Sequence, residues 1–200
     1  WVALVARENA TGAVSRAAFA MPCFWTGQAQ LGALDDVLGV EAGFVGASEV
    51  VLVSFRGGAE TLARITERAE KLDCALGVWA ARGAELDVIT PRLGPRARAF
   101  EEPSRAPDGD QLFHLARSPL HFLPLTELQC VRVNAVLGGA RGDEVVKGLA
   151  RWLSPRQQAL ARLIEPALRA DEHALDGLAR PRTADALAGY ERQVRERLAR

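Results

Sequence analysis

The sequence predicts an α+β fold, in which a small sheet domain is followed by a helical extension. Strand and helix signals alternate in the first part of the chain, whereas apolar residues recur at helical spacing toward its end. Between these parts, residues 101–110 (Glu-Glu-Pro-Ser-Arg-Ala-Pro-Asp-Gly-Asp) have the composition of a linker. We therefore expect an α+β domain at residues 1–100, a linker at 101–110 and a helical extension at 111–200.

Each predicted element has a local signal in the sequence. Proline at the first position of a helix loses no hydrogen bond, so Pro22 begins the first helix. Alternating or β-rich runs indicate strands, and the Gly57-Gly58 pair ends one of them. In chain order we expect a strand at 14–20, a helix from Pro22 to Leu34, strands at 40–44 and 49–55, a helix carrying Leu62, Ile65, Ala69 and Leu72, and a strand at 74–80.

The order β-α-β-β-α-β is that of the ferredoxin-like split βαβ fold, with an antiparallel sheet. In this fold the first strand usually lies between the third and the fourth and runs antiparallel to both. The end of the first strand then lies beside the starts of the other two. This topology predicts that Cys23, Phe44, Glu49 and Cys74 meet at one rim of the sheet.

Two capping boxes mark helices in the C-terminal part. Thr126 is followed three residues later by Gln129, and Ser154 by Gln157, each before an apolar stripe at helical spacing. We interpret these stripes as packing surfaces.

Composition and charge argue against several classes of function. The chain has 25 basic and 25 acidic residues, so no net charge steers it toward nucleic acid or anionic lipid. No apolar run approaches the roughly 20 residues that a membrane helix needs. Three widely spaced cysteines, no Cys-x-x-Cys and distant histidines predict neither a disulfide framework nor a metal or cofactor site. The chain starts at Trp1 rather than methionine, which leaves the compartment and an upstream targeting segment open.

Cys23, in the segment Met-Pro-Cys-Phe-Trp-Thr-Gly, is the strongest candidate for chemistry. We expect it in the first turn of its helix, where the positive end of the helix dipole favours the nucleophilic thiolate. Phe24 and Trp25 can line an apolar pocket beside the sulfur. Glu49, desolvated by these aromatics, would tend to hold a proton and could donate it to a substrate oxygen. The sequence therefore predicts thiol redox chemistry centred on Cys23.

The order of these motifs resembles that of peptide methionine sulfoxide reductase A. That family carries Gly-Cys-Phe-Trp-Gly, a Gly-Tyr-Gly-Gly-like turn after the second strand, and a Glu-Val-Val strand. This chain has Cys23-Phe-Trp, then Gly39-Val-Glu-Ala-Gly-Phe-Val-Gly46, then Glu49-Val-Val-Leu-Val-Ser-Phe55. The resemblance extends over residues 14–72.

The resemblance implies a role for each matching residue. Cys23 would be the nucleophile, Phe24 and Trp25 would receive the substrate methyl group, and Glu49 would be the acid. The thiolate would attack the sulfoxide sulfur of an oxidised methionine and leave a sulfenic acid on Cys23. A second thiol would then form a disulfide, which an external reductant such as a thioredoxin-like protein opens.

The chain also departs from the family pattern. Pro22 and Thr26 replace the glycines that flank the family's motif, and the loop before the acid is shorter. Phe44 stands at the turn tyrosine, so a hydroxyl that would help bind the sulfoxide oxygen is missing. The family's later Asp-x-Gly-x-Gln-Tyr-Arg segment has no match. We therefore expect weak or altered activity, or a different oxidised substrate.

Two further hypotheses stay open. In one, the protein is a dithiol-disulfide oxidoreductase that uses Cys23 and Cys74. In the other, it is a non-catalytic binding module on the same scaffold. The missing tyrosine hydroxyl favours these two, whereas the retained Cys23, Phe24, Trp25 and Glu49 favour the reductase. Within the reductase hypothesis Cys74 is the preferred resolving thiol, because the topology places it at the rim, and Cys130 is the alternative.

Overall fold

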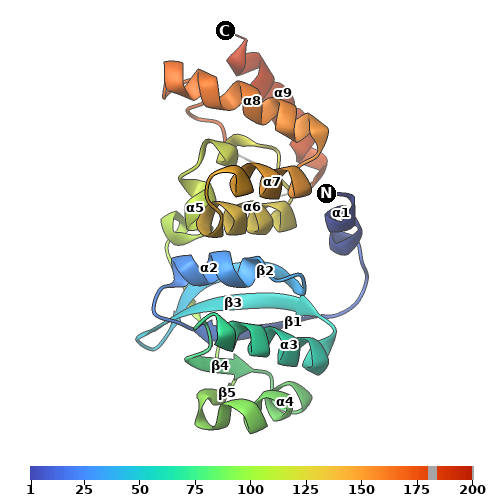
Figure 1. Cartoon of the computed structure of the whole chain (residues 1–200), viewed down its shortest axis with the longest axis vertical. Coiled ribbons are helices and arrows are strands. Elements are labelled where there is room, and N and C mark those ends of the chain that lie inside the picture. Colours follow the sequence, from blue (N-terminus) through green and yellow to red (C-terminus); the bar gives the residue numbers. More distant parts are fainter. Residues whose placement is uncertain (180–183, 200) are drawn as a thin grey trace.

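The fold is α+β, with helices packed around a mixed, open sheet of six strands (Figure 1). The computed structural model describes residues 1–179 and 184–199. The strands are β1 (Val14–Ala20), β2 (Val37–Val45), β3 (Ser48–Arg56), β4 (Gly77–Ala80), β5 (Ala97–Ala99) and β6 (Ser104–Arg105). The α-helices are α1 (Val2–Glu8), α2 (Phe24–Gly32), α3 (Gly58–Lys71), α4 (Ala84–Leu93), α5 (Phe113–Ala116), α6 (Glu127–Gly139), α7 (Asp143–Trp152), α8 (Pro155–Ala170) and α9 (Ala184–Leu198).

The strand order is β5-β4-β1-β3-β2-β6. As predicted, β1 lies between β4 and β3 and runs antiparallel to both. Ala20, the last residue of β1, pairs with Val50 on one side and Gly77 on the other. The end of β1 therefore lies beside the starts of β3 and β4, at the rim expected from the sequence.

The sheet is mixed rather than purely antiparallel, which corrects the sequence-based expectation. Strand β5 runs parallel to β4, because the unpredicted helix α4 returns the chain to the same end of the sheet before β5 begins. Strand β6 adds to the opposite edge and pairs antiparallel with β2. Both extra strands have only two or three residues, too few to give a periodic signal in the sequence.

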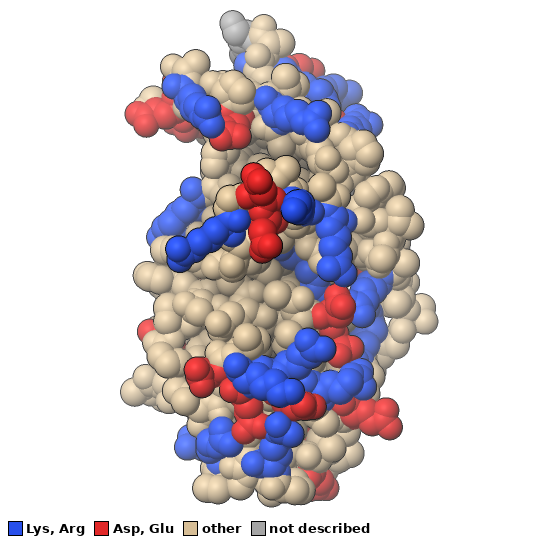
Figure 2. Space-filling view, viewed as in Figure 1, with Lys and Arg blue, Asp and Glu red and all other residues tan. Residues whose placement is uncertain are grey.

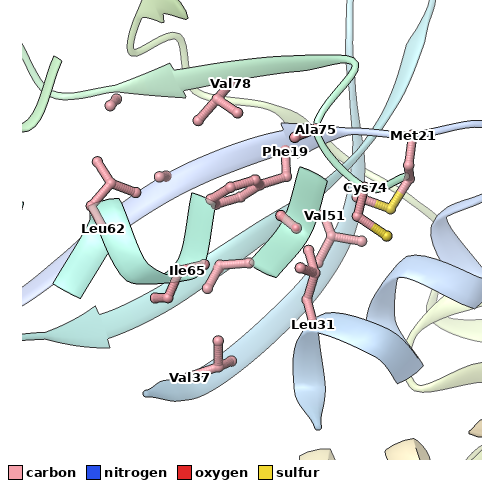
Figure 3. Close-up of a cluster of buried hydrophobic side chains, with 14 of the residues drawn as sticks. Phe19, Met21, Leu31, Val37, Val51, Leu62, Ile65, Cys74, Ala75 and Val78 are labelled. Atoms are coloured by element: carbon pink, nitrogen blue, oxygen red, sulfur yellow. The ribbon is translucent and has the colours of Figure 1, made fainter. Parts of the chain in front are cut away.

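The two faces of the sheet are covered differently. Helices α2 and α3 cover one face, and Figure 3 shows their Leu31, Leu62 and Ile65 packed on Phe19 and Val51. On the other face, a smaller cluster contains Ala18, Ala20, Val45, Val50, Leu52 and Trp79. Since β5 and β6 lie at opposite edges, residues 100–103 must cross the sheet between them. Phe100 packs on the smaller cluster as the chain crosses.

Residues 101–110, for which the composition predicted a linker, lie against the sheet. Ser104 and Arg105 form β6, and Ala106 is buried and donates its N–H to the Ala42 carbonyl at 2.9 Å. Proline and glycine thus mark where regular structure is interrupted, but they do not determine whether the segment packs on its neighbours.

The C-terminal helices have a core of their own, which includes Leu125, Val133, Leu160 and Ile164. Both predicted capping boxes are present, at Thr126 and at Ser154. The N3 residues of the two capping boxes, Gln129 and Gln157, also hydrogen-bond to each other. Each side-chain amide donates to the oxygen of the other, at 2.9 and 2.8 Å. Each capping box therefore satisfies backbone N–H groups at the start of its own helix, and the glutamine pair joins the starts of the two helices.

A buried arginine joins the helical part to the sheet domain. Helix α6 lies over α2 (Figure 1), and its Arg132 is only 1% exposed. The guanidinium donates to the carbonyls of Gly32, Asp35 and Val37, where α2 ends and β2 begins. Burial lowers the pKa of Arg132 to about 10, so it still carries its charge at neutral pH. Arg132 thereby caps the C-terminal end of α2.

The surface carries both signs of charge. Figure 2 shows acidic and basic side chains interspersed over the face that it presents, in keeping with the zero net charge. No helix among residues 1–179 and 184–199 is long and apolar enough to span a membrane.

We expect Arg132→Ala to destabilise the protein by about 2–3 kcal/mol, because the buried carbonyls of Gly32 and Val37 lose their shared donor. Urea unfolding measures this loss. Arg162→Ala on α8, which removes an exposed arginine, is the matched control and should change the unfolding free energy by less than about 0.5 kcal/mol. Similar small losses in both variants would contradict the role given to Arg132.

Candidate thiol site

Cys23 lies at the N-terminal end of α2. It is the N-cap residue, with extended backbone angles (φ −149°, ψ 115°), and its carbonyl accepts the first helical bond from the Gly27 N–H at 3.0 Å. The helix begins at Phe24, so Pro22 lies outside it, which corrects the predicted start. The Cys23 side chain is partly exposed. The sulfur therefore still stands at the positive end of the helix dipole, within reach of solvent.

Glu49 is held at the same helix end. Its Oε2 accepts the Phe24 N–H at 2.8 Å, and its backbone carbonyl accepts the Met21 N–H at 3.2 Å. The carboxyl group thus binds the first amide after Cys23, from a strand 25 residues farther along the chain.

The three aromatic residues predicted for the site form one cluster. The Phe24 ring meets Trp25 at 6.1 Å and Phe44 at 5.5 Å between centroids, both edge to face. Phe24 is buried, at 6% exposure, whereas Trp25 and Phe44 are half-buried. Aromatic edges and faces therefore surround the start of α2, on the side away from β4.

Sequence reasoning missed the residues that hold Trp25. Its indole Nε1–H donates to Asp110 Oδ1 at 3.0 Å, and Phe113 stacks on it with centroids 3.9 Å apart. The guanidinium of Arg117 lies over the other face of this assembly, 3.6 Å from the Phe113 centroid. The Asp-Gly-Asp turn at residues 108–110 was the only local signal, and it does not indicate where the turn packs.

Two glutamines fix the segment that carries these residues. Gln28 on α2 is fully buried; its amide donates to the Asp110 carbonyl at 2.8 Å and accepts the Leu112 N–H at 2.7 Å. The Gln111 amide pairs with both the N–H and the carbonyl of Ala42, at 2.9 and 3.0 Å. A primary amide can replace a peptide group in this way because it offers the same donor and acceptor. The segment beside Trp25, which contains Asp110 and Phe113, is therefore fixed to the sheet domain by these hydrogen bonds.

Cys74 lies near the rim but is buried. It precedes β4, which begins at Gly77 rather than at Cys74, because Asp73 turns the chain with a positive φ of 56°. Cys74 is 2% exposed, and its Sγ donates to Gln30 Oε1 at 2.9 Å. Figure 3 shows its side chain beside that of Met21. Burial raises the pKa of the Cys74 thiol to about 11, and the Asp73 charge adds to this rise.

The remaining cysteine is remote from the rim. Cys130 is buried on α6, in the core of the C-terminal helices. Cys23, Cys74 and Cys130 are all among the described residues, and no disulfide joins any two of them. Residues 1–179 and 184–199 hold no cluster of three metal-binding side chains.

A cavity of about 470 Å³ opens between the β2–β6 edge and α5, and Cys23 is not among the residues that line it. Its charged residues are Glu127 and Arg105, and Arg105 forms ion pairs with the lining residues Glu41 and Asp108. Since no cysteine lines the cavity, we do not assign the thiol chemistry to it.

The sequence matches no protein-family model, and it has no significant match among curated proteins. The resemblance to peptide methionine sulfoxide reductase A therefore remains a prediction based on the motifs.

The raised pKa of Cys74 makes a prediction for stability. The unfolded thiol ionises near its ordinary pKa of 9.0, and the folded thiol only near 11, so folding loses stability as the pH rises between these values. By pH 10.5 the loss should be about 2 kcal/mol. Cys74→Ala should abolish it. Urea unfolding of both proteins from pH 8 to 10.5, under reducing conditions, measures the difference. A difference that stays constant with pH would contradict the burial of this thiol.

Proposed function

We propose that this protein is a thiol-dependent reductase of methionine sulfoxide, or of a related methyl sulfoxide, with Cys23 as the nucleophile. One observation carries the proposal: the Glu49 carboxyl binds the first amide of the helix that Cys23 caps. A nucleophile and an acid from different elements thus share one helix end. A buried structural cysteine would need neither the exposure nor the neighbouring carboxyl.

The arrangement of strands supports the same proposal. With β1 between β4 and β3, and β2 beside β3, the four inner strands have the order expected for a ferredoxin-like split βαβ sheet. We propose that the protein is a divergent relative of peptide methionine sulfoxide reductase A. In this proposal α4, β5, β6 and the C-terminal helices are additions to that scaffold.

The reaction needs one thiolate and one proton. The Cys23 thiolate attacks the sulfoxide sulfur and forms a transient sulfur–sulfur bond. The protonated oxygen then transfers from the substrate sulfur to the Cys23 sulfur, so that the substrate sulfur–oxygen bond and the sulfur–sulfur bond both break and a sulfenic acid remains on Cys23. Cys23 loses two electrons, and the substrate sulfur gains them to become a thioether. The proton on the sulfenic oxygen comes from Glu49.

The aromatic cluster would bind the methyl group of the substrate. Phe24, Trp25 and Phe44 offer apolar surface at the helix start, and a methyl sulfoxide is apolar at the methyl end alone. The Phe113 stack and the Asp110 hydrogen bond hold the Trp25 indole in one orientation. A fixed indole ring favours a single orientation of the substrate sulfur relative to Cys23.

The sulfenic acid has to be reduced by another thiol. A resolving cysteine attacks as a thiolate, and Cys74 is buried with a raised pKa of about 11. We therefore propose that an external thiol attacks Cys23 directly, which releases water and leaves a mixed disulfide. A second thiol of the reductant, which would be a thioredoxin-like protein, then displaces the Cys23 thiolate. The burial and raised pKa of Cys74 also weigh against disulfide exchange between Cys23 and Cys74.

The proposal predicts turnover of a methyl sulfoxide with dithiothreitol as reductant. Cys23→Ser should abolish it, because a serine hydroxyl is a far weaker nucleophile at neutral pH. Glu49→Gln should lower kcat by a factor of about 100, since the amide can bind the sulfoxide oxygen but cannot protonate it. Release of the thioether measures both. If wild-type protein with a reduced, accessible Cys23 gives no turnover, a non-catalytic binding module replaces this proposal.

The route of reduction is tested separately. Cys74→Ser should retain turnover with dithiothreitol within about twofold, because the external thiol reaches Cys23 without it. Mass spectrometry after one equivalent of methyl sulfoxide, without reductant, should find a sulfenic acid on Cys23. A Cys23–Cys74 disulfide in its place would restore Cys74 as the resolving thiol.

A further inference from the structure

A groove of about 330 Å³ runs from the thiol site across the start of β4. At one end it is lined by Glu49 and by Pro22, the residue before Cys23. At the other end it is lined by Arg98 on β5. The groove therefore connects the proposed reaction site with a cation on the edge strand of the sheet.

Small residues and one indole shape this groove. Gly77 has no side chain, and a Cβ there would lie 3.2 Å from the Trp79 ring. Trp79 is buried and belongs to the cluster on this face of the sheet, so its ring lies at the bottom of the groove. Leu76, which is 58% exposed, adds an apolar wall. An unbranched chain can thus pass over Gly77 between the two charged ends.

Arg98 is held in place but carries an unneutralised charge. Trp79 and Arg98 are register partners on β4 and β5, and the guanidinium lies 5.0 Å from the centre of the indole. This contact orients the guanidinium. Among the described residues Arg98 forms no ion pair, whereas Arg16 on the same face pairs with Glu102 at 2.6 Å. The donors of Arg98 therefore remain available to a ligand.

We propose that Arg98 binds a carboxylate of the substrate while the oxidised sulfur of the same molecule lies at Cys23. This inference rests on the proposed function and adds a substrate class to it. Arg98 is in register with Trp79. Trp79 lies two residues along β4 from the rim residue Gly77, which corresponds to about 7 Å. The unbranched side chain of oxidised methionine can extend along such a groove. Guanidinium and carboxylate match as paired donors and acceptors.

The charges at the two ends also set the orientation. Arg98 attracts a carboxylate, while Glu49, when ionised, repels one from the end beside Cys23. The bound carboxylate could be the main-chain carboxylate of oxidised methionine or an acidic side chain next to it in a peptide. Both present the same chemistry to Arg98, so the experiment has to compare them.

Binding is measured by calorimetry with sulfones, because a sulfone resembles the sulfoxide and is not reduced by this reaction. The first pair is N-acetylmethionine sulfone and its neutral amide. The second pair consists of two short amidated peptides that carry the sulfone beside either Asp or Asn. The carboxylate member of at least one pair should bind about fivefold more tightly than its neutral partner. A preference in the first pair identifies the main-chain carboxylate, and a preference in the second an acidic neighbour.

Arg98→Gln should remove the preference, and Arg98→Lys should retain part of it. Arg82→Gln is the control: it removes another exposed arginine, just beyond the other end of β4, and should leave the preference unchanged. Each variant is checked by thermal unfolding.

The outcomes separate this inference from the proposed function. No sulfone binding, equal binding within both pairs, or a preference that survives Arg98→Gln would overturn the role of Arg98, even if the wild type reduces sulfoxides. A preference that depends on Arg98, without any sulfoxide turnover, would support the carboxylate site and refute the reductase.

Discussion

The thiol site depends on how helix α2 is held at its two ends. At the N-terminal end, the Glu49 carboxyl binds the Phe24 amide beside Cys23. At the C-terminal end, Arg132 binds the carbonyls of Gly32, Asp35 and Val37. A carboxyl at the start of a helix and a cation at its end are the arrangement that the helix dipole favours. Together these contacts fix the nine-residue helix that positions Cys23 between the sheet and the helical layer.

The helical part therefore contributes to the site without supplying a reactive group. Arg132 comes from α6, and α6 is itself anchored by the paired glutamines of the two capping boxes. The segment before α5 supplies Asp110 and Phe113, which hold Trp25. Removal of the helical part would expose three carbonyls at the end of α2 and one face of the Trp25 ring. We therefore regard the helical part and the sheet as jointly responsible for the geometry around Cys23.

The two cysteines near the rim differ because their surroundings differ. Cys23 is partly exposed at a helix start, whereas Cys74 is enclosed behind α2 and hydrogen-bonded to Gln30. Burial raises the pKa of the Cys74 thiol to about 11, although Cys74 lies near the same rim as Cys23. The groove that leads to Arg98 lies across the sheet from α2 and α3, which leaves two approaches to the rim: an apolar one by Trp25 and a charged one by Arg98.

The sequence by itself determined the inner strands, the helices with regular apolar stripes and both capping boxes, because those signals are local and periodic. From the strand order it also placed Cys23 and Glu49 at one rim. Only the tertiary structure decided the rest. Strands β5 and β6 are too short to show a period, and their residues become strands because a neighbouring edge is available. The positions of Asp110, Phe113 and Arg98 at the site, like the burial of Cys74, depend on contacts between segments distant in sequence. No local pattern encodes such contacts, since they arise only when the chain packs.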